Sequence, residues 1–189
     1  MKKDFLKCAK VLVVAFILLA VYSCDDDPYV EFDYTLQCTD ELLQYVTPVV
    51  TYKDNNGVTV TFDIEESKWD IPSKTSNFTV VINGDTIKYN KEWKKTTNYN
   101  DFTEVEDELT VRYKLKDGVT EDMLPAISSF GHRLSVQIEL KDKDNDMHAF
   151  AASANKSSFG SLSRILDAVD YFGFKAMNNG QIEQKEYKE

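Results

Sequence analysis

Apolar and polar residues alternate one by one along three segments of the chain, residues 58–65, 109–116 and 134–141. The apolar positions hold Val, Ile, Leu, Phe or Tyr, and every position between them is polar or charged. This period of two is typical of half-buried antiparallel strands. Less regular runs predict further strands at 29–38, 48–54, 77–83, 85–91 and 147–154. We therefore expect a mainly β domain of about eight antiparallel strands.

Short polar connections predict how these strands pair. Asn55-Asn56-Gly57 and Asn83-Gly84 each separate two strand-like runs, and short Asn-Gly connections strongly favour a β-hairpin. The polar run at 141–146 predicts a third, longer hairpin loop. Strands joined in this way most simply form an antiparallel β-sandwich in Ig-like or Greek-key style. An α+β fold with one antiparallel sheet is the alternative.

Two or three short helices are expected among the strands. The pair Thr39-Asp40 can cap a helical turn at 41–46, which Pro48 then ends. An acidic first turn predicts another short helix at 120–124. Apolar residues follow a spacing of 3.6 residues over 161–172, which predicts a C-terminal amphipathic helix packed across a sheet.

The first 23 residues differ from the rest of the chain. Four lysines and one aspartate precede a wholly apolar run of 11 residues at 11–21. A positively charged start followed by a short apolar run is the layout of a secretory signal peptide. A membrane-spanning helix needs about 17–25 apolar residues, so this run is too short for one. We therefore expect residues 1–23 to be a signal peptide.

The end of the apolar run reads Val21-Tyr22-Ser23-Cys24. It resembles the lipobox of bacterial lipoproteins, in which an aliphatic residue and a small residue precede the cysteine, although Tyr22 replaces the usual small residue between them. The resemblance implies that the Cys24 thiol receives a diacylglyceryl group, that the signal is cut before it, and that the new amine is acylated, for example by palmitate. An ordinary signal cleaved nearby, which would leave a free thiol, is the alternative.

Three aspartates, Asp25, Asp26 and Asp27, follow this cysteine. An acidic cluster at this place resembles the lipoprotein export signal of Bacteroidota, and the whole chain is similar in style to small surface lipoproteins of that phylum. The resemblance implies a lipid anchor in the outer membrane with the protein facing outward. A periplasm-facing protein is the alternative, because an aspartate after the lipidated cysteine retains enterobacterial lipoproteins at the inner membrane.

The mature chain is predicted to hold one folded domain. After a lipidated cysteine and acidic tether at 24–28, we expect a single β-rich domain at 29–178 and a polar tail at 179–189. An extended residue spans at most about 3.3–3.6 Å, so the tether reaches less than roughly 20 Å. Such a short tether favours an accessory protein that lies beside an outer-membrane protein partner.

Charge excludes several classes of partner. Residues 24–189 contain 18 basic and 31 acidic residues, a net charge of about −13. Nucleic acid requires a basic surface, and anionic lipid attracts one, so we expect neither as a direct partner of the protein surface. Membrane attachment is therefore expected through covalent lipid at Cys24 alone.

The sequence contains no signature of a common enzyme class or of a cofactor site. There is no G-x-S-x-G, H-E-x-x-H, P-loop or dinucleotide-binding glycine pattern, so we expect no enzyme and no cofactor. Cys38 shares a strand face with apolar residues and is expected to be a buried, unpaired thiol. His132 and His148 flank the loop at 141–146 or begin its strands and are expected at the surface.

Aromatic residues among polar ones at 91–102 are the predicted binding surface. Trp93, Tyr99 and Phe102 can contact a glycan, because aromatic faces stack on sugar rings. For Trp93 itself, burial in the core is the favoured interpretation and ligand contact the alternative, and the same two interpretations apply to Trp69 in the same order.

Two short motifs add weaker hypotheses. Asp85-Thr86-Ile87 matches the O-glycosylation sequon of Bacteroidota, which would make Thr86 a modified residue. Asp142, Asp144 and Asp146 repeat the acidic spacing of a calcium loop, but the glycine and glutamate that such a loop also needs are absent. A solvated hairpin loop without metal is therefore expected there.

Together these observations predict a lipid-anchored extracytoplasmic module for binding, with glycan or nutrient capture as the expected role. A structural or assembly subunit of the cell envelope or of a pilus-like system, without a small ligand, is the alternative.

Overall fold

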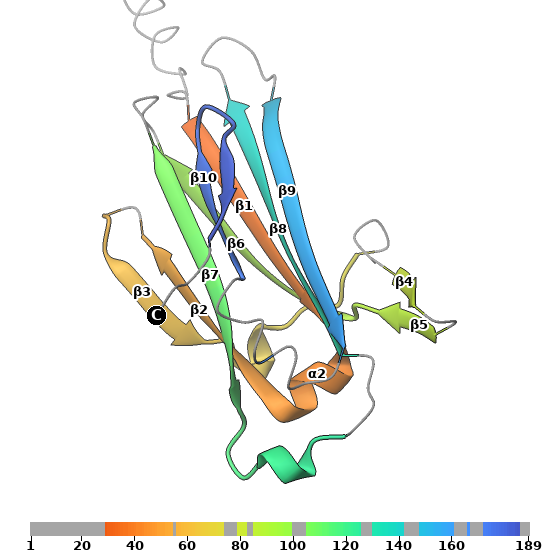
Figure 1. Ribbon diagram of the computed structural model, residues 1–189. Helices are drawn as coiled ribbons and strands as arrows, with labels where there is room; N and C mark the ends of the chain where they lie inside the picture. Colours follow the sequence, from red (N-terminus) through yellow and green to blue (C-terminus); the bar gives the residue numbers. More distant parts are fainter. Residues whose placement is uncertain are drawn as a thin grey trace, which may run out of the picture.

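A computed structural model of the 189-residue chain shows two large antiparallel sheets and a separate small hairpin (Figure 1). The structure describes residues 29–54, 56–73, 79–82, 85–99, 105–125, 130–141, 148–160, 166 and 172–185. Cys24, the three aspartates that follow it, Phe102 and the Asp142, Asp144 and Asp146 loop lie outside the described residues.

Strands dominate the described chain, and the prediction of a mainly β antiparallel fold is confirmed. Their order, with one short α-helix and two 3₁₀ helices, is β1 (Tyr29–Cys38), α2 (Asp40–Tyr45), β2 (Val46–Lys53), β3 (Thr59–Asp63), η2 (Glu66–Lys68), β4 (Thr79–Ile82), β5 (Asp85–Lys88), β6 (Lys91–Tyr99), β7 (Glu106–Leu115), η3 (Glu121–Met123), β8 (Phe130–Lys141), β9 (His148–Gly160), β10 (Gly173–Met177) and β11 (Ile182–Gln184).

The strands form three sheets. Four strands lie in the order β6-β1-β8-β9, and five lie in the order β11-β10-β7-β2-β3. The β4–β5 hairpin stands apart from both sheets at the lower right of Figure 1. Because β1 lies in the first sheet and β2 in the second, the chain passes from one sheet to the other at α2.

All three predicted hairpins are present. Strand β2 pairs with β3 across residues 54–58, β4 pairs with β5 across a two-residue connection, and β8 pairs with β9. The helix predicted after Thr39 is also present. The Thr39 side chain caps its first turn by accepting a hydrogen bond from Leu42 N at 3.3 Å. The helix ends earlier than predicted, and Val46 and Pro48 belong to β2.

Buried side chains from both large sheets form one hydrophobic cluster. On β1 every second residue points into it, and Cys38 is buried there as predicted. The second sheet contributes side chains from β2, β7 and β10 to the same cluster. The core therefore lies between the two large sheets.

The sequence-based prediction missed β6, β10 and β11. Strand β6 was missed because its inward positions include Lys95 and Thr97, which pair with Tyr34 and Phe32 of β1, so its sequence lacks an alternating apolar pattern. Strand β11 lies within the expected polar tail. The predicted helix at 161–172 lies outside the described residues except at Leu166 and Phe172.

Candidate functional site

The aromatic residues of the predicted binding surface face the interior. Trp93 is only 8% exposed, belongs to the hydrophobic cluster, and lies 5.9 Å from the ring of Phe62 between centroids. Tyr99 is half-buried and packs edge-to-face on Phe32 at 5.8 Å. These contacts favour the core alternative for Trp93, and the structure gathers no exposed aromatic surface from Trp93 and Tyr99.

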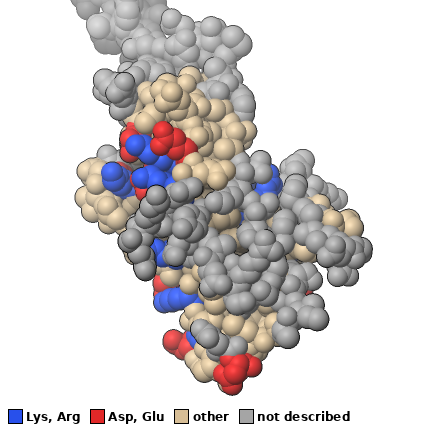
Figure 2. All heavy atoms as spheres, in the orientation of Figure 1, with Lys and Arg blue, Asp and Glu red and all other residues tan. Residues whose placement is uncertain are grey.

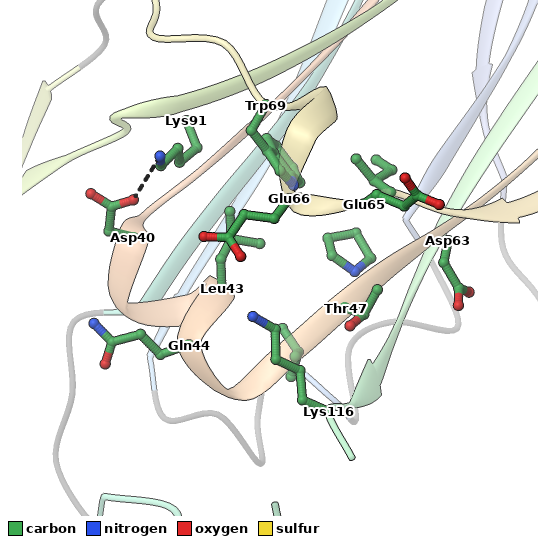
Figure 3. Close-up of a pocket in the computed structure, with 13 residues that line it drawn as sticks. Asp40, Leu43, Gln44, Thr47, Asp63, Glu65, Glu66, Trp69, Lys91 and Lys116 are labelled. Carbon is green, nitrogen blue, oxygen red and sulfur yellow. Dashed lines mark ion pairs between the residues drawn. The ribbon is translucent and has the colours of Figure 1, made fainter.

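A pocket of about 600 Å³ lies instead beside α2, at the end of the molecule where β1 finishes. Its walls come from α2, the start of β2, the end of β3, η2, the start of β6 and the residue after β7 (Figure 3). The lining residues are Asp40, Leu43, Gln44, Val46, Thr47, Pro48, Asp63, Ile64, Glu65, Glu66, Trp69, Lys91 and Lys116.

Backbone hydrogen bonds fix the walls of the pocket relative to one another. Ile64 N donates to Pro48 O at 2.9 Å, and Lys116 N donates to Tyr45 O at 2.9 Å. At the other side, Asp40 N donates to the Asn90 side chain at 2.8 Å. Because these walls are hydrogen-bonded to neighbouring elements, the pocket is preformed, as small-molecule sites usually are.

Trp69 lies on the wall of this pocket (Figure 3). It follows η2 directly, and Asp70 beside it exchanges two backbone hydrogen bonds with Glu92, of 2.8 and 2.9 Å. Trp69 is half-buried and packs against the hydrophobic cluster, which leaves part of its side chain exposed. Of the two tryptophans, Trp69 is therefore the one placed to contact a ligand.

Three of the six charged side chains that line the pocket form ion pairs. Asp40 forms an ion pair with Lys91 at 3.6 Å, and the Asn90 amide also donates to it. Asp63 forms an ion pair with Lys114, which lies outside the pocket lining. Two carboxylates, Glu65 and Glu66, and the ammonium of Lys116 have no ion pair among the described residues.

Glu66 and Lys116 approach the pocket from opposite sides. Figure 3 shows their charged ends pointing toward one another across it, with Trp69 behind Glu66. Both charged groups are thus available to accept or donate hydrogen bonds to a molecule that lies between them.

Sequence reasoning missed most of this site. Its residues come from five separate stretches between residues 40 and 116, and no local motif joins them. Only Trp69 was identified as a possible ligand contact, because it is one of the two tryptophans of the chain. The common location of the other residues depends on pairing of distant strands.

His132 corrects a second expectation, because it is fully buried rather than at the surface. Its Nδ1 lies 2.7 Å from the Tyr113 hydroxyl, and its ring stacks on Phe172 with centroids 3.9 Å apart. The prediction failed because strand β8 begins at Phe130, so His132 lies within the sheet, opposite Cys38. The side chain of His148 lies outside the described residues.

Cys38 adjoins the same group, with Sγ 3.8 Å from the Tyr113 hydroxyl. Burial raises the pKa of the Cys38 thiol to about 12, although the Tyr113 hydrogen bond lowers it. The thiol therefore stays protonated at neutral pH, and the reactive form of cysteine is the thiolate. The environment of Cys38 suits packing and opposes nucleophilic chemistry.

Thr86 is exposed on β5, in the hairpin that stands apart from the two large sheets (Figure 1). Its side chain is accessible, as modification of the Asp85-Thr86-Ile87 motif requires. Within the part of the chain that the structure describes, no helix is long and apolar enough to cross a membrane.

Comparisons with protein families, with curated proteins and with solved structures find no match to this chain.

Proposed function

We propose that this chain is a lipid-anchored extracytoplasmic binding module of the outer membrane, facing the cell exterior, and that the pocket beside α2 holds its ligand. The observation that carries the proposal is a preformed pocket of about 600 Å³ with a half-buried tryptophan on its wall. Small-ligand sites typically measure about 300–1,000 Å³ and combine aromatic or apolar walls with a few polar groups. The anchor and the outward orientation rest on the Cys24 junction and on the aspartates that follow it.

The fold that we propose for this module is a β-sandwich in Ig-like or Greek-key style. The two large sheets share one hydrophobic cluster, and the chain changes sheet between β1 and β2, between β6 and β7, and between β7 and β8. Such repeated crossing between two sheets is typical of Greek-key sandwiches.

The position of the pocket suits a tethered protein. Strand β1 begins at Tyr29, a few residues after Cys24, and Cys38 at its other end leads directly into α2. A strand of 10 residues spans about 33 Å at about 3.3 Å per residue. Figure 1 shows α2 at the far end of β1 from Tyr29, so the pocket beside α2 would face away from the membrane that holds Cys24.

A glycan or another polar nutrient is the ligand class expected for such a module. Trp69 offers an apolar face, while carboxylates, an ammonium, an amide and a hydroxyl surround it. Half-exposed aromatic side chains with polar neighbours are favoured where one surface must contact both apolar and polar groups.

Two experiments test the proposal. The anchor predicts that cells fed labelled palmitate transfer the label to the wild-type protein but not to Cys24→Ser, and that protease added to intact cells removes the protein. The pocket predicts that Trp69→Ala loses retention on a glycan array, whereas Ile71→Ala retains it, because Ile71 is 84% exposed and does not line the pocket. A protease-protected protein would contradict surface exposure, and a Trp69→Ala variant that binds normally would contradict the pocket.

A further inference from the structure

The charges around the pocket decide which ligands it can accept, if the pocket is the binding site proposed above. Asp40 is matched by Lys91, and Asp63 is matched by Lys114. Glu66 and Lys116 point toward one another from opposite sides (Figure 3). Glu65 has no basic group of this kind beside it, and the lining as a whole holds four carboxylates and two ammonium groups, a net charge of −2.

We infer that the pocket binds an uncharged saccharide, held against Trp69 and hydrogen-bonded by Glu66 and Lys116, and that it rejects acidic saccharides. This inference rests on the proposed function and adds the ligand class.

An anionic ligand is disfavoured by the absence of a surplus basic group. A uronate or sulfate would lose hydration on entering, and the lining offers little to compensate: Lys91 already pairs with Asp40, and the unpaired Lys116 ammonium points toward the Glu66 carboxylate. The lining itself adds repulsion, because its four carboxylates outnumber its two ammonium groups. On the face that Figure 2 shows, acidic side chains also lie at the lower end of the molecule. Loss of hydration and repulsion therefore both act against an anion.

A purely apolar ligand is disfavoured as well. It would displace water from the Glu66 carboxylate and the Lys116 ammonium without replacing the hydrogen bonds. Gln44 and Thr47 add an amide and a hydroxyl to the same lining. This mixture of donors and acceptors matches the hydroxyl groups of a sugar, whose ring face can lie on the indole.

Charged partners make these hydrogen bonds strong but insensitive to salt. A hydrogen bond to a charged group contributes about 1.5–3 kcal/mol, which corresponds to a change of roughly 10- to 150-fold in affinity. Because the ligand itself has no charge, ionic strength should barely alter its affinity. An anionic ligand would instead show a clear dependence on salt.

The test uses the purified protein and matched trisaccharides: maltotriose, mannotriose and xylotriose as neutral probes, and trigalacturonic acid as the acidic probe. Binding is measured by calorimetry at low and high salt for the wild type, Glu66→Gln and Lys116→Gln. The matched controls are Glu183→Gln and Lys88→Gln, because both residues are exposed and lie outside the pocket lining. Circular dichroism confirms that each variant is folded.

We expect at least one neutral probe to bind independently of salt, with affinity lowered tenfold or more in Glu66→Gln and Lys116→Gln and unchanged in the controls. Preferential, salt-sensitive binding of trigalacturonic acid would overturn the ligand class while leaving a ligand-binding pocket in place. Equal affinity in wild type, Glu66→Gln and Lys116→Gln would overturn the assigned roles. Failure of every probe to bind would overturn both this inference and glycan capture.

Discussion

The hydroxyl of Tyr99 on β6 donates a hydrogen bond of 2.9 Å to Oδ2 of Asp107 on β7, and so joins the two large sheets. Asp107 is fully buried. Burial raises the pKa of the Asp107 carboxyl above its usual range, although the Tyr99 hydrogen bond and the charge of Lys95 act in the opposite direction. A carboxyl group thus lies within the core, between the two large sheets.

Replacing Asp107 by Asn should stabilise the protein at neutral pH. A carboxyl whose pKa is higher in the folded than in the unfolded state destabilises the fold when it is ionised, and this penalty disappears as pH falls through the folded pKa and then the unfolded pKa. The stability advantage of Asp107→Asn should therefore be largest at neutral pH and vanish near the ordinary aspartate pKa of about 3.9.

Urea unfolding at a series of pH values measures this difference. Asp117→Asn is the matched control, because Asp117 is exposed in a turn. An Asp107→Asn protein that is less stable than wild type by the same amount at every pH would show that the buried carboxylate is a net stabiliser.

Tyr99→Phe should weaken the fold without affecting ligand binding. The substitution removes the Tyr99 hydroxyl that donates to Asp107. The buried Asp107 carboxyl then accepts one hydrogen bond fewer, at a cost of about 1–3 kcal/mol. Denaturant unfolding gives the free energy, and a glycan array gives the binding. A Tyr99→Phe protein that keeps full stability but loses glycan retention would instead show that Tyr99 contacts the ligand.

The two tryptophans should respond differently to truncation. Trp93→Ala removes a buried ring from the core and should cost about 3–5 kcal/mol of unfolding free energy. Trp69→Ala should cost clearly less, because Trp69 is only half-buried. Equal stability losses measured by urea unfolding would contradict this division of roles.

Gly173→Ala should destabilise the pairing of β10 with β7. A methyl group at Gly173 would lie 2.7 Å from Thr110 Cγ2 and 2.8 Å from the Leu109 carbonyl oxygen, and the second contact is with backbone that cannot easily move. Crowding of this kind typically costs about 1–3 kcal/mol. Gly118→Ala is a useful comparison: nothing lies within 4 Å of its added methyl, but its φ of +81° also strains the backbone.

Hydrogen exchange then locates the effect of Gly173→Ala. Faster exchange confined to β10 and its neighbours is expected, because the clash lies at that pairing. Wild-type stability of the variant would contradict the close approach of β10 to β7.

The fold could be predicted from sequence only where one strand face is apolar. Strand β8 was evident from Leu134 onward because its inward residues there are aliphatic, whereas β6 was not, because Lys95 and Thr97 occupy inward positions beside Trp93. Strand β10 is only five residues long and follows a segment with helical spacing, so its pairing with β7 could not be inferred locally.

The candidate site was still less predictable. Trp69 was conspicuous, but core packing was the favoured interpretation for it, and the choice between core and ligand contact depends on how much of its side chain remains exposed. Glu66 and Lys116 are 50 positions apart in the sequence. They line the same pocket only because η2 and the residue after β7 lie on two of its walls. Ordinary charged residues of this kind carry no local signal.

Fluorescence of single-tryptophan variants tests ligand binding at Trp69 most directly. Trp93→Phe leaves Trp69 as the reporter in the pocket, and Trp69→Phe leaves Trp93 as the reporter in the core. Titration of a neutral oligosaccharide should produce a saturable change in the emission of Trp93→Phe and no change in that of Trp69→Phe. A saturable change reported by Trp93 alone, or binding that leaves Trp69 emission unaltered, would contradict the pocket as the binding site.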